Sequence, residues 1–281
     1  MKQQERLGLL AVALGAAGFS TAILFNRAVA GMNGAQISFF RAVVAFLFFS
    51  LLCRKRRLRC RRGYRAALFV PLVGLALTVG ATGALYMAAL RATTAATAVL
   101  LNNTSAIYVA LFAPLLLKEP PHPAVRFSLP LALGGMLLVT QGALAGSWRG
   151  LALGTASGLS YAGTMLISRR LGGEVDGLVQ AWWGMAGAML VALPFAVGTP
   201  WALLRLNALR LAAMGVVAVG LPYYLYFLGL ERAPAQLVSL MAMLEPICGV
   251  LIGALLLHEP MTVAAGIGVV LVLTAIALVS R

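Results

Sequence analysis

Charged residues, and acidic residues above all, are scarce in this chain of 281 residues. Only 10% of the residues are charged, against about 25% in soluble proteins, while 62% are hydrophobic. Seven acidic residues stand against 22 basic ones, which gives a net charge of +15. A chain with so few charges cannot keep a folded surface wetted. A soluble protein is therefore excluded, and an integral membrane protein is predicted.

Side chains that build enzyme sites are also few. The two histidines, His122 and His258, fall in loops on opposite sides of the predicted membrane and cannot share a metal ion. The single aspartate, Asp176, cannot join His258 in a catalytic triad for the same reason. A phosphate-binding loop of the Gly-x-x-x-x-Gly-Lys type is missing, so this chain does not use ATP. We expect no enzyme, no metal and no cofactor.

The three cysteines add no further chemistry. They have neither a metal-binding spacing nor the pattern of a disulfide framework: Cys53, Cys60 and Cys248. Cys248 sits in an apolar run, where a cysteine is usually a small packing residue.

The apolar residues gather in ten runs of about 20 residues, the length that crosses the hydrocarbon core of a bilayer. The runs cover residues 7–28, 35–53, 66–89, 95–117, 127–145, 150–168, 178–197, 209–229, 235–257 and 262–280. The first run leads directly into the fold, so we interpret it as a helix and not as a cleaved signal peptide. The sequence thus predicts an all-α polytopic membrane protein with ten transmembrane helices.

One stretch occurs twice. A shift of 140 residues lays 85–120 over 225–260 without a gap and aligns Glu119-Pro120 with Glu259-Pro260. A period this long is typical of the duplicated halves of transporters. We expect a first five-helix repeat over 1–145 and a second over 146–281, which together form one transmembrane domain.

Basic residues fix the predicted orientation. Sixteen of them fall on one side of the ten spans and five on the other, and Arg41 lies within the second span. Eight of the sixteen lie in one loop: Arg54, Lys55, Arg56, Arg57, Arg59, Arg61, Arg62 and Arg65. Positive residues mark cytoplasmic loops, so both termini are expected in the cytoplasm. Since five spans is an odd number, the second half enters the membrane from the opposite side, as an inverted repeat. The loop itself suits anionic lipid, and no nucleic acid is expected.

The sequence at the repeated helix ends resembles that of a known protein family. An apolar helix that ends in Lys118-Glu119-Pro120, and again in His258-Glu259-Pro260, resembles the drug/metabolite transporter superfamily and more narrowly its ten-helix EamA-type members. The resemblance covers essentially the whole chain. The second copy, which begins with Leu244-Glu245-Pro246, matches better, because the first copy has 102–105 as Asn-Asn-Thr-Ser at the corresponding place.

This resemblance implies a secondary transporter that exports amino acids or similar small metabolites across the bacterial inner (cell) membrane by alternating access. Within this family, the chain most resembles the aromatic and amino-acid exporters, by its overall length and its helices with tyrosine and asparagine. A multidrug or nucleotide-sugar carrier of the same fold is the alternative, and a membrane enzyme or a non-transporting scaffold is the alternative from another class. The expected partners are a small-molecule substrate and the lipid bilayer, with the protein a monomer or homodimer.

Polar groups inside the membrane are costly and indicate function. The most polar cluster includes Asn102, Asn103 and Ser105, with Asn102 and Ser105 on one face of a helix. These residues either line a cavity or join helices through hydrogen bonds. The first interpretation is favoured, because two adjacent amides cannot both face the same partner helix.

Glu245 is the one acidic residue predicted deep within a span, next to Pro246. It either carries a coupling proton or is a structural carboxylate, paired with a cation or capping a broken helix. The structural interpretation is favoured, because Ser105 occupies the corresponding place in the first half. Arg41 could pair with Glu245, bind a substrate carboxylate or reach the outer interface, and the sequence favours the interface.

Aromatic residues complete the candidate site. Tyr86 and Tyr226 correspond under the shift of 140, and Tyr161 lies mid-span among small residues, where a ring with a hydroxyl suits a cavity wall. Trp182 and Tyr223 join them as candidates. The full set of predicted cavity residues is Tyr86, Asn102, Asn103, Ser105, Tyr161, Trp182, Tyr223, Tyr226 and Glu245.

Overall fold

The computed structural model describes residues 3–56, 66–141, 147–258 and 260–279, and this part of the chain folds into helices without a strand. The first repeat contains α1 (Gln3–Ser20), α2 (Ala22–Ala28), α3 (Gly34–Arg56), α4 (Ala66–Ala92), α5 (Ala95–Asn103), α6 (Ser105–Leu116) and α7 (Pro123–Val139). The second contains α8 (Trp148–Leu171), α9 (Gly177–Ala192), the 3-10 helix η1 (Leu193–Phe195), α10 (Trp201–Ala213), the π-helix η2 (Met214–Gly220), α11 (Leu221–Arg232), α12 (Ala235–Ala242), α13 (Leu244–Leu256) and α14 (Val263–Val279). The basic loop at 57–65 lies outside the described residues.

Seven helical segments of the described chain are long and apolar enough to cross a membrane. They are Gln3–Ala28, Gly34–Arg54, Ala67–Ala92, Ala95–Leu116, Gly177–Phe195, Trp201–Arg232 and Ala235–Leu256. Two shorter apolar helices are α7 and α14. The remaining predicted span, α8, is rich in glycine, serine and threonine, because it packs in the interior against α4, α5 and α6. The structure confirms a helical, multi-pass membrane protein, and the count of ten spans stays a prediction.

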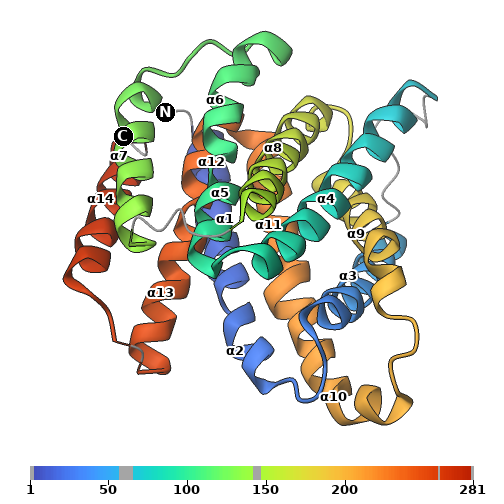
Figure 1. The fold of residues 1–281 in the computed structure, drawn as a ribbon. Coiled ribbons are helices and arrows are strands. Elements are labelled where there is room, and N and C mark those ends of the chain that lie inside the picture. Colours follow the sequence, from blue (N-terminus) through green and yellow to red (C-terminus); the bar gives the residue numbers. More distant parts are fainter. Residues whose placement is uncertain (1–2, 57–65, 142–146, 259, 280–281) are drawn as a thin grey trace.

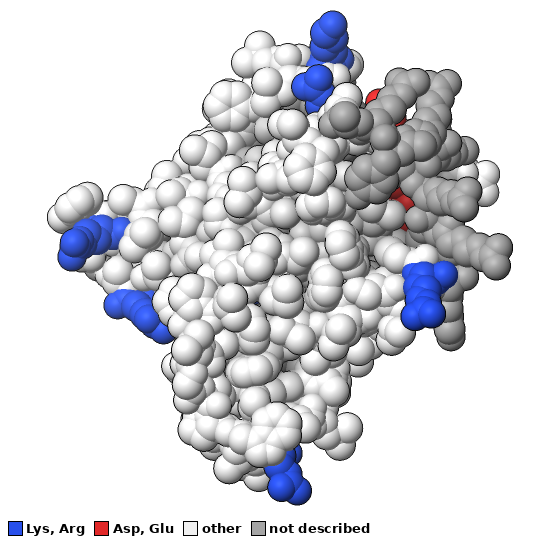
Figure 2. All heavy atoms as spheres, turned by 90° about the vertical axis from the view of Figure 1, so that its right-hand side faces the viewer, with Lys and Arg blue, Asp and Glu red and all other residues white. Residues whose placement is uncertain are grey.

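The outer surface suits contact with lipid. Figure 2 shows a broad face without Lys, Arg, Asp or Glu, with basic side chains only at its edges. Large apolar side chains are exposed on the helices of the first repeat, among them Leu47, Leu51, Val70 and Leu77. Exposed leucine and valine at this density would be costly in water and are stable in hydrocarbon.

Helix packing repeats between the two halves. α1 packs along α11 as α8 packs along α4, and α3 contacts η2 as α9 contacts α4. Under the shift of 140 these pairs correspond, which is the contact pattern that an inverted repeat predicts. α7 and α14, also counterparts, lie side by side (Figure 1). Their close approach requires glycine, since a Cβ at Gly135 would lie 2.7 Å from the carbonyl oxygen of Gly268.

Two spans predicted as continuous are broken in mid-course. The fourth breaks at Thr104, between α5 and α6, and the ninth breaks at Met243, between α12 and α13. The breaks fall one position apart under the shift of 140. Both spans also end alike, because Lys118 (φ 56°) and His258 (φ 54°) adopt the left-handed conformation that terminates a helix. Broken helices of this kind place backbone ends and polar side chains at the depth where transporters bind their substrates.

Candidate functional site

A cavity of about 870 Å³ lies between the repeats and is lined by residues of both. It reaches the surface beside Asn26, Arg27, Arg91 and Phe195, which line it and are themselves exposed. These four residues come from the C-terminal ends of α2, α4 and η1. The inner part of the cavity lies against α5, α8, α11 and α13, close to the two helix breaks.

Seven of the nine predicted residues line this cavity: Tyr86, Asn102, Asn103, Tyr161, Tyr223, Tyr226 and Glu245. They come from helices that are distant in sequence, and the fold brings them together. Their role in binding a substrate stays a prediction.

Ser105 and Trp182 do not lie on the cavity wall. The break at Thr104 ends the helical face that Ser105 was expected to share with Asn102, and Ser105 is buried as the first residue of α6. The Trp182 indole lies between α3 and α9, where its Nε1 donates a hydrogen bond of 2.8 Å to Ser50 Oγ. Its ring packs against Phe46 with centroids 5.1 Å apart. Trp182 is therefore placed as a helix-packing residue.

Glu245 stands in the first turn of α13 and lines the cavity. Its backbone carbonyl accepts a hydrogen bond of 2.7 Å from Ser20 Oγ, which fixes the helix break against α1. Its carboxylate forms no hydrogen bond and no ion pair with the described residues. The structural partner that the sequence favoured for this carboxylate is thus missing in the described structure.

Arg41 also lines the cavity, contrary to the interpretation that it reaches the outer interface. The π-helix η2 holds this part of α3 in place, because Gly215 allows the two backbones to approach. A Cβ at Gly215 would lie 3.0 Å from the Arg41 carbonyl oxygen and would collide with Val44. π-Helical turns are frequent at functional sites, and here one packs beside Arg41.

Arg41 and Glu245 are near enough to influence one another electrostatically, and both act on Tyr86 and Tyr223. They nonetheless form no ion pair within 4.0 Å among the described residues. The two charges therefore share one polar region of the cavity without neutralising each other by direct contact.

Three tyrosines and a phenylalanine build one wall. The rings of Tyr161 and Tyr226 stack with centroids 6.0 Å apart, and Phe19 packs edge-on against Tyr223 at 4.9 Å. Tyr226 is 2% exposed, and its hydroxyl makes no hydrogen bond of good geometry in the described structure, although it lies close to the Tyr161 hydroxyl. A buried hydroxyl whose hydrogen bonding is incomplete costs free energy, which a bound ligand would recover.

The two asparagines combine the alternatives that the sequence left open. Asn102 lines the cavity and also accepts a hydrogen bond of 3.2 Å from Ser157 Oγ of α8. Asn103 Nδ2 donates to the carbonyl oxygen of Val99 within its own helix, at 2.9 Å. Asn102 is therefore held in place by a neighbouring helix while it faces the cavity.

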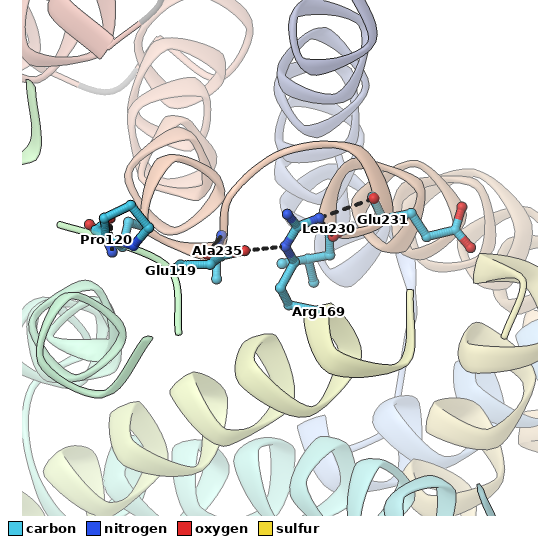
Figure 3. A network of polar contacts seen from close by, with 7 residues as sticks. Glu119, Pro120, Arg169, Leu230, Glu231 and Ala235 are labelled. Atoms are coloured by element: carbon cyan, nitrogen blue, oxygen red, sulfur yellow. Dashed lines mark hydrogen bonds and ion pairs between the residues drawn. The ribbon is translucent and has the colours of Figure 1, made fainter. Parts of the chain in front are cut away.

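The end of the molecule opposite the cavity opening is tied together by an ion pair (Figure 3). Arg169 Nε donates to Glu119 Oε1 at 2.5 Å, and Arg169 Nη1 donates to the carbonyl oxygens of Leu230 and Glu231, each at 3.1 Å. Glu119 Oε2 accepts a hydrogen bond of 3.1 Å from the backbone N–H of Ala235, at the start of α12. We call these five residues the Glu119–Arg169 network.

A second set of contacts adjoins this network. Gln236 Oε1 accepts from the backbone N–H of His122 at 3.1 Å, and Gln236 Nε2 donates to the carbonyl oxygen of Pro120 at 3.4 Å. Nearby Leu230 and Leu237 are fully buried. The turn after α6 is thereby fixed to α8, α11 and α12.

Sequence reasoning missed two parts of this arrangement. Arg41 and Met185 line the cavity and were not among the predicted cavity residues. Arg169 was counted only among the sixteen basic residues that fix the orientation. The repeated Glu-Pro after α6 was a usable sign, since a carboxylate at a fixed place in both halves needs a partner. Within the described residues, no cluster of three metal-ligating side chains is found.

Comparison with known proteins agrees with this architecture. A protein from Archaeoglobus fulgidus described as an uncharacterized transporter is 27% identical, over 98% of this chain and 97% of its own length. A protein of known crystal structure has the same fold, with a TM-score of 0.79 over 96% of this chain and 95% of its own, at 18% identity. The model of the EamA-like transporter family matches twice, over residues 6–141 and 148–281. The chain therefore belongs to the EamA-like transporter family.

Proposed function

We propose that the protein is a secondary transporter that exports amino acids or similar small metabolites across the bacterial inner (cell) membrane by alternating access. The observation that carries this proposal is the cavity between the repeats. It is open beside Arg91, and we assign its closure at the other end to the Glu119–Arg169 network, whose residues do not line it. Transport would require the reverse state, in which the opening closes and this network separates.

In this proposal the chain spans the membrane ten times, as two inverted repeats over 1–145 and 146–281, with both termini in the cytoplasm. The N- and C-terminal ends of the described chain lie on the same side of the molecule (Figure 1). The cavity would then open to the outside and be closed toward the cytoplasm, as in an exporter that has just released its substrate.

Counterflow tests the function directly. The purified protein would be placed in liposomes loaded with one unlabelled amino acid and diluted into the same labelled compound. A panel of amino acids is run beside a nucleotide sugar and a lipophilic cation, which represent the alternative cargo classes. We expect accumulation of label for at least one amino acid and none in protein-free liposomes. Counterflow confined to the nucleotide sugar or the cation would contradict the amino-acid assignment.

Orientation is tested by labelling. With the native cysteines replaced, single cysteines at Arg54 and at the exposed Trp148 should react with an impermeant thiol reagent from opposite sides of intact cells. Reaction of both from outside would contradict the inverted-repeat topology.

A further inference from the structure

One cation and one anion face the same region of the cavity without a partner among the described residues. Arg41 comes from α3 and Glu245 from α13, and both line the cavity. No hydrogen bond from either side chain to a described residue is found, and the two charges do not meet within 4.0 Å. An unpaired charge inside a membrane is costly, and its persistence indicates a function.

We infer that Arg41 and Glu245 bind the two opposite charges of a zwitterion, with Arg41 on the carboxylate and Glu245 on the ammonium group. This inference rests on the proposed transport function and names the recognition residues. A guanidinium matches a carboxylate with two parallel hydrogen bonds of about 2.7–2.9 Å. Because the two protein charges do not touch, the adjacent carboxylate and ammonium of an α-amino acid fit between them, each against its opposite charge.

The surroundings indicate the rest of the ligand. Tyr86 and Tyr223 lie within the electrostatic reach of both charges, and Tyr226, whose hydroxyl makes no hydrogen bond of good geometry in the described structure, lines the same cavity. Apolar side chains such as Val79 and Met185 line the wall as well. The cavity thus offers two charges to the amino-acid head group and an aromatic and aliphatic surface to its side chain. We therefore assign an α-amino acid with an apolar side chain.

The opening carries a different charge pattern. Arg27 and Arg91 line it, both exposed, and the acidic lining residue, Glu245, lies deeper. Exposed charges are screened by salt, so these arginines attract anions in general and do not select between them. A plain carboxylate would bind Arg41 and leave Glu245 without a charged partner among the described residues. If the site recognises a zwitterion, a ligand that lacks either head-group charge should bind more weakly.

Three ligands with one side chain test this inference: phenylalanine, phenethylamine without the carboxylate, and 3-phenylpropionate without the ammonium group. In equilibrium binding to the purified wild-type protein, phenylalanine should bind about 10- to 100-fold more tightly than either analogue, the loss typical of a hydrogen bond to a charged group. This comparison needs no variant.

Two variants then assign each charge to a residue. Arg41→Gln should lower the affinity for phenylalanine to that for phenethylamine and leave the affinity for phenethylamine unchanged. Glu245→Gln should lower the affinity for phenylalanine to that for 3-phenylpropionate and leave the affinity for 3-phenylpropionate unchanged. Arg205→Gln and Glu174→Gln serve as matched controls, because both side chains are exposed and outside the cavity. If Arg41→Gln does not fold, Arg41→Lys keeps the charge, and the same ranking of ligands is expected with reduced affinity for phenylalanine.

The outcomes separate the two proposals. Equal binding of all three ligands, or equal loss of all three in both variants, would overturn the zwitterion site even while amino-acid counterflow persists. Counterflow of the nucleotide sugar or the lipophilic cation alone would also overturn it and leave a transporter of other cargo. If no compound shows counterflow, both the transport function and this inference fail.

Discussion

Two carboxylates of this protein, those of Glu119 and Glu245, differ in their hydrogen-bond partners. Both oxygens of Glu119 are occupied, one by Arg169 at 2.5 Å and the other by the Ala235 N–H at 3.1 Å. Neither oxygen of Glu245 has a hydrogen-bond partner in the described structure. The Glu119 carboxylate, from the turn after α6, contacts the start of α12, and Glu245 lies in the first turn of α13. Negative charge is favoured at both helix starts.

The different surroundings of the two carboxylates indicate different roles: Glu119 stabilises the packed end of the molecule, and Glu245 is available to bind a ligand. A carboxylate whose partners all belong to the protein stabilises one conformation, and Glu119 holds α8, α11 and α12 together at the packed end. A carboxylate that faces a cavity without partners is available to a ligand. The same contrast holds for the cations, since Arg169 binds Glu119 and two carbonyl oxygens, whereas Arg41 binds no described residue directly. We therefore expect substitutions at the two places to change different properties.

The largest effect on stability is expected from Arg169→Gln. It removes the ion pair and both carbonyl contacts, and leaves Glu119, which is 17% exposed, without its cation. We expect a loss of about 2–3 kcal/mol in unfolding free energy, less than for a fully buried pair because both side chains retain some solvent. Thermal unfolding in detergent measures it. Arg170→Gln, the exposed neighbour, is the control and should be near neutral, and equal melting of the two variants would contradict a closing role.

A smaller effect, on affinity alone, is expected from Tyr226→Phe. The hydroxyl is buried beside the Tyr161 hydroxyl and makes no hydrogen bond of good geometry, so its removal should leave the unfolding free energy unchanged or raise it. If the hydroxyl binds substrate, amino-acid affinity should fall about two- to tenfold, as for a neutral hydrogen bond. Tyr224→Phe on the same helix, outside the cavity lining, is the control. Destabilisation by Tyr226→Phe would show that the hydroxyl has a structural partner.

The smallest effect is expected from Ser157→Ala. Ser157 Oγ contacts Asn102 Oδ1 at 3.2 Å and its own helix at the Gly154 carbonyl oxygen at 2.7 Å. Loss of both should cost about 1 kcal/mol in stability and loosen Asn102 at the cavity wall. Ser239→Ala also removes a buried intrahelical bond, of 2.8 Å, but does not contact Asn102. Only Ser157→Ala should also weaken substrate binding, and the same change in both variants would assign Asn102 to packing.

The helical membrane fold and the repeated helix ends were readable in the sequence, because they depend on long apolar runs and on a fixed spacing of 140. Seven candidate residues on the cavity wall were also found, since polar and aromatic groups within apolar runs stand out. The positions of Ser105 and Trp182 were not, because the break at Thr104 and the packing of α9 on α3 decide them. The partner of Glu119 could not be found either, because Arg169 lies 50 residues away and only the tertiary fold brings it to the turn after α6.

The contrast between the two carboxylates is tested most directly by substrate-dependent thermal unfolding of Glu119→Gln and Glu245→Gln. The ligand is the amino acid with the strongest counterflow, which stabilises the protein in proportion to its binding. We predict that Glu119→Gln melts at a lower temperature than wild type and still gains stability from the amino acid. Glu245→Gln is predicted to melt no lower than wild type and to lose that gain. An unchanged gain in Glu245→Gln, together with a lowered melting temperature, would contradict the assignment of Glu245 to the ligand and return it to a structural role.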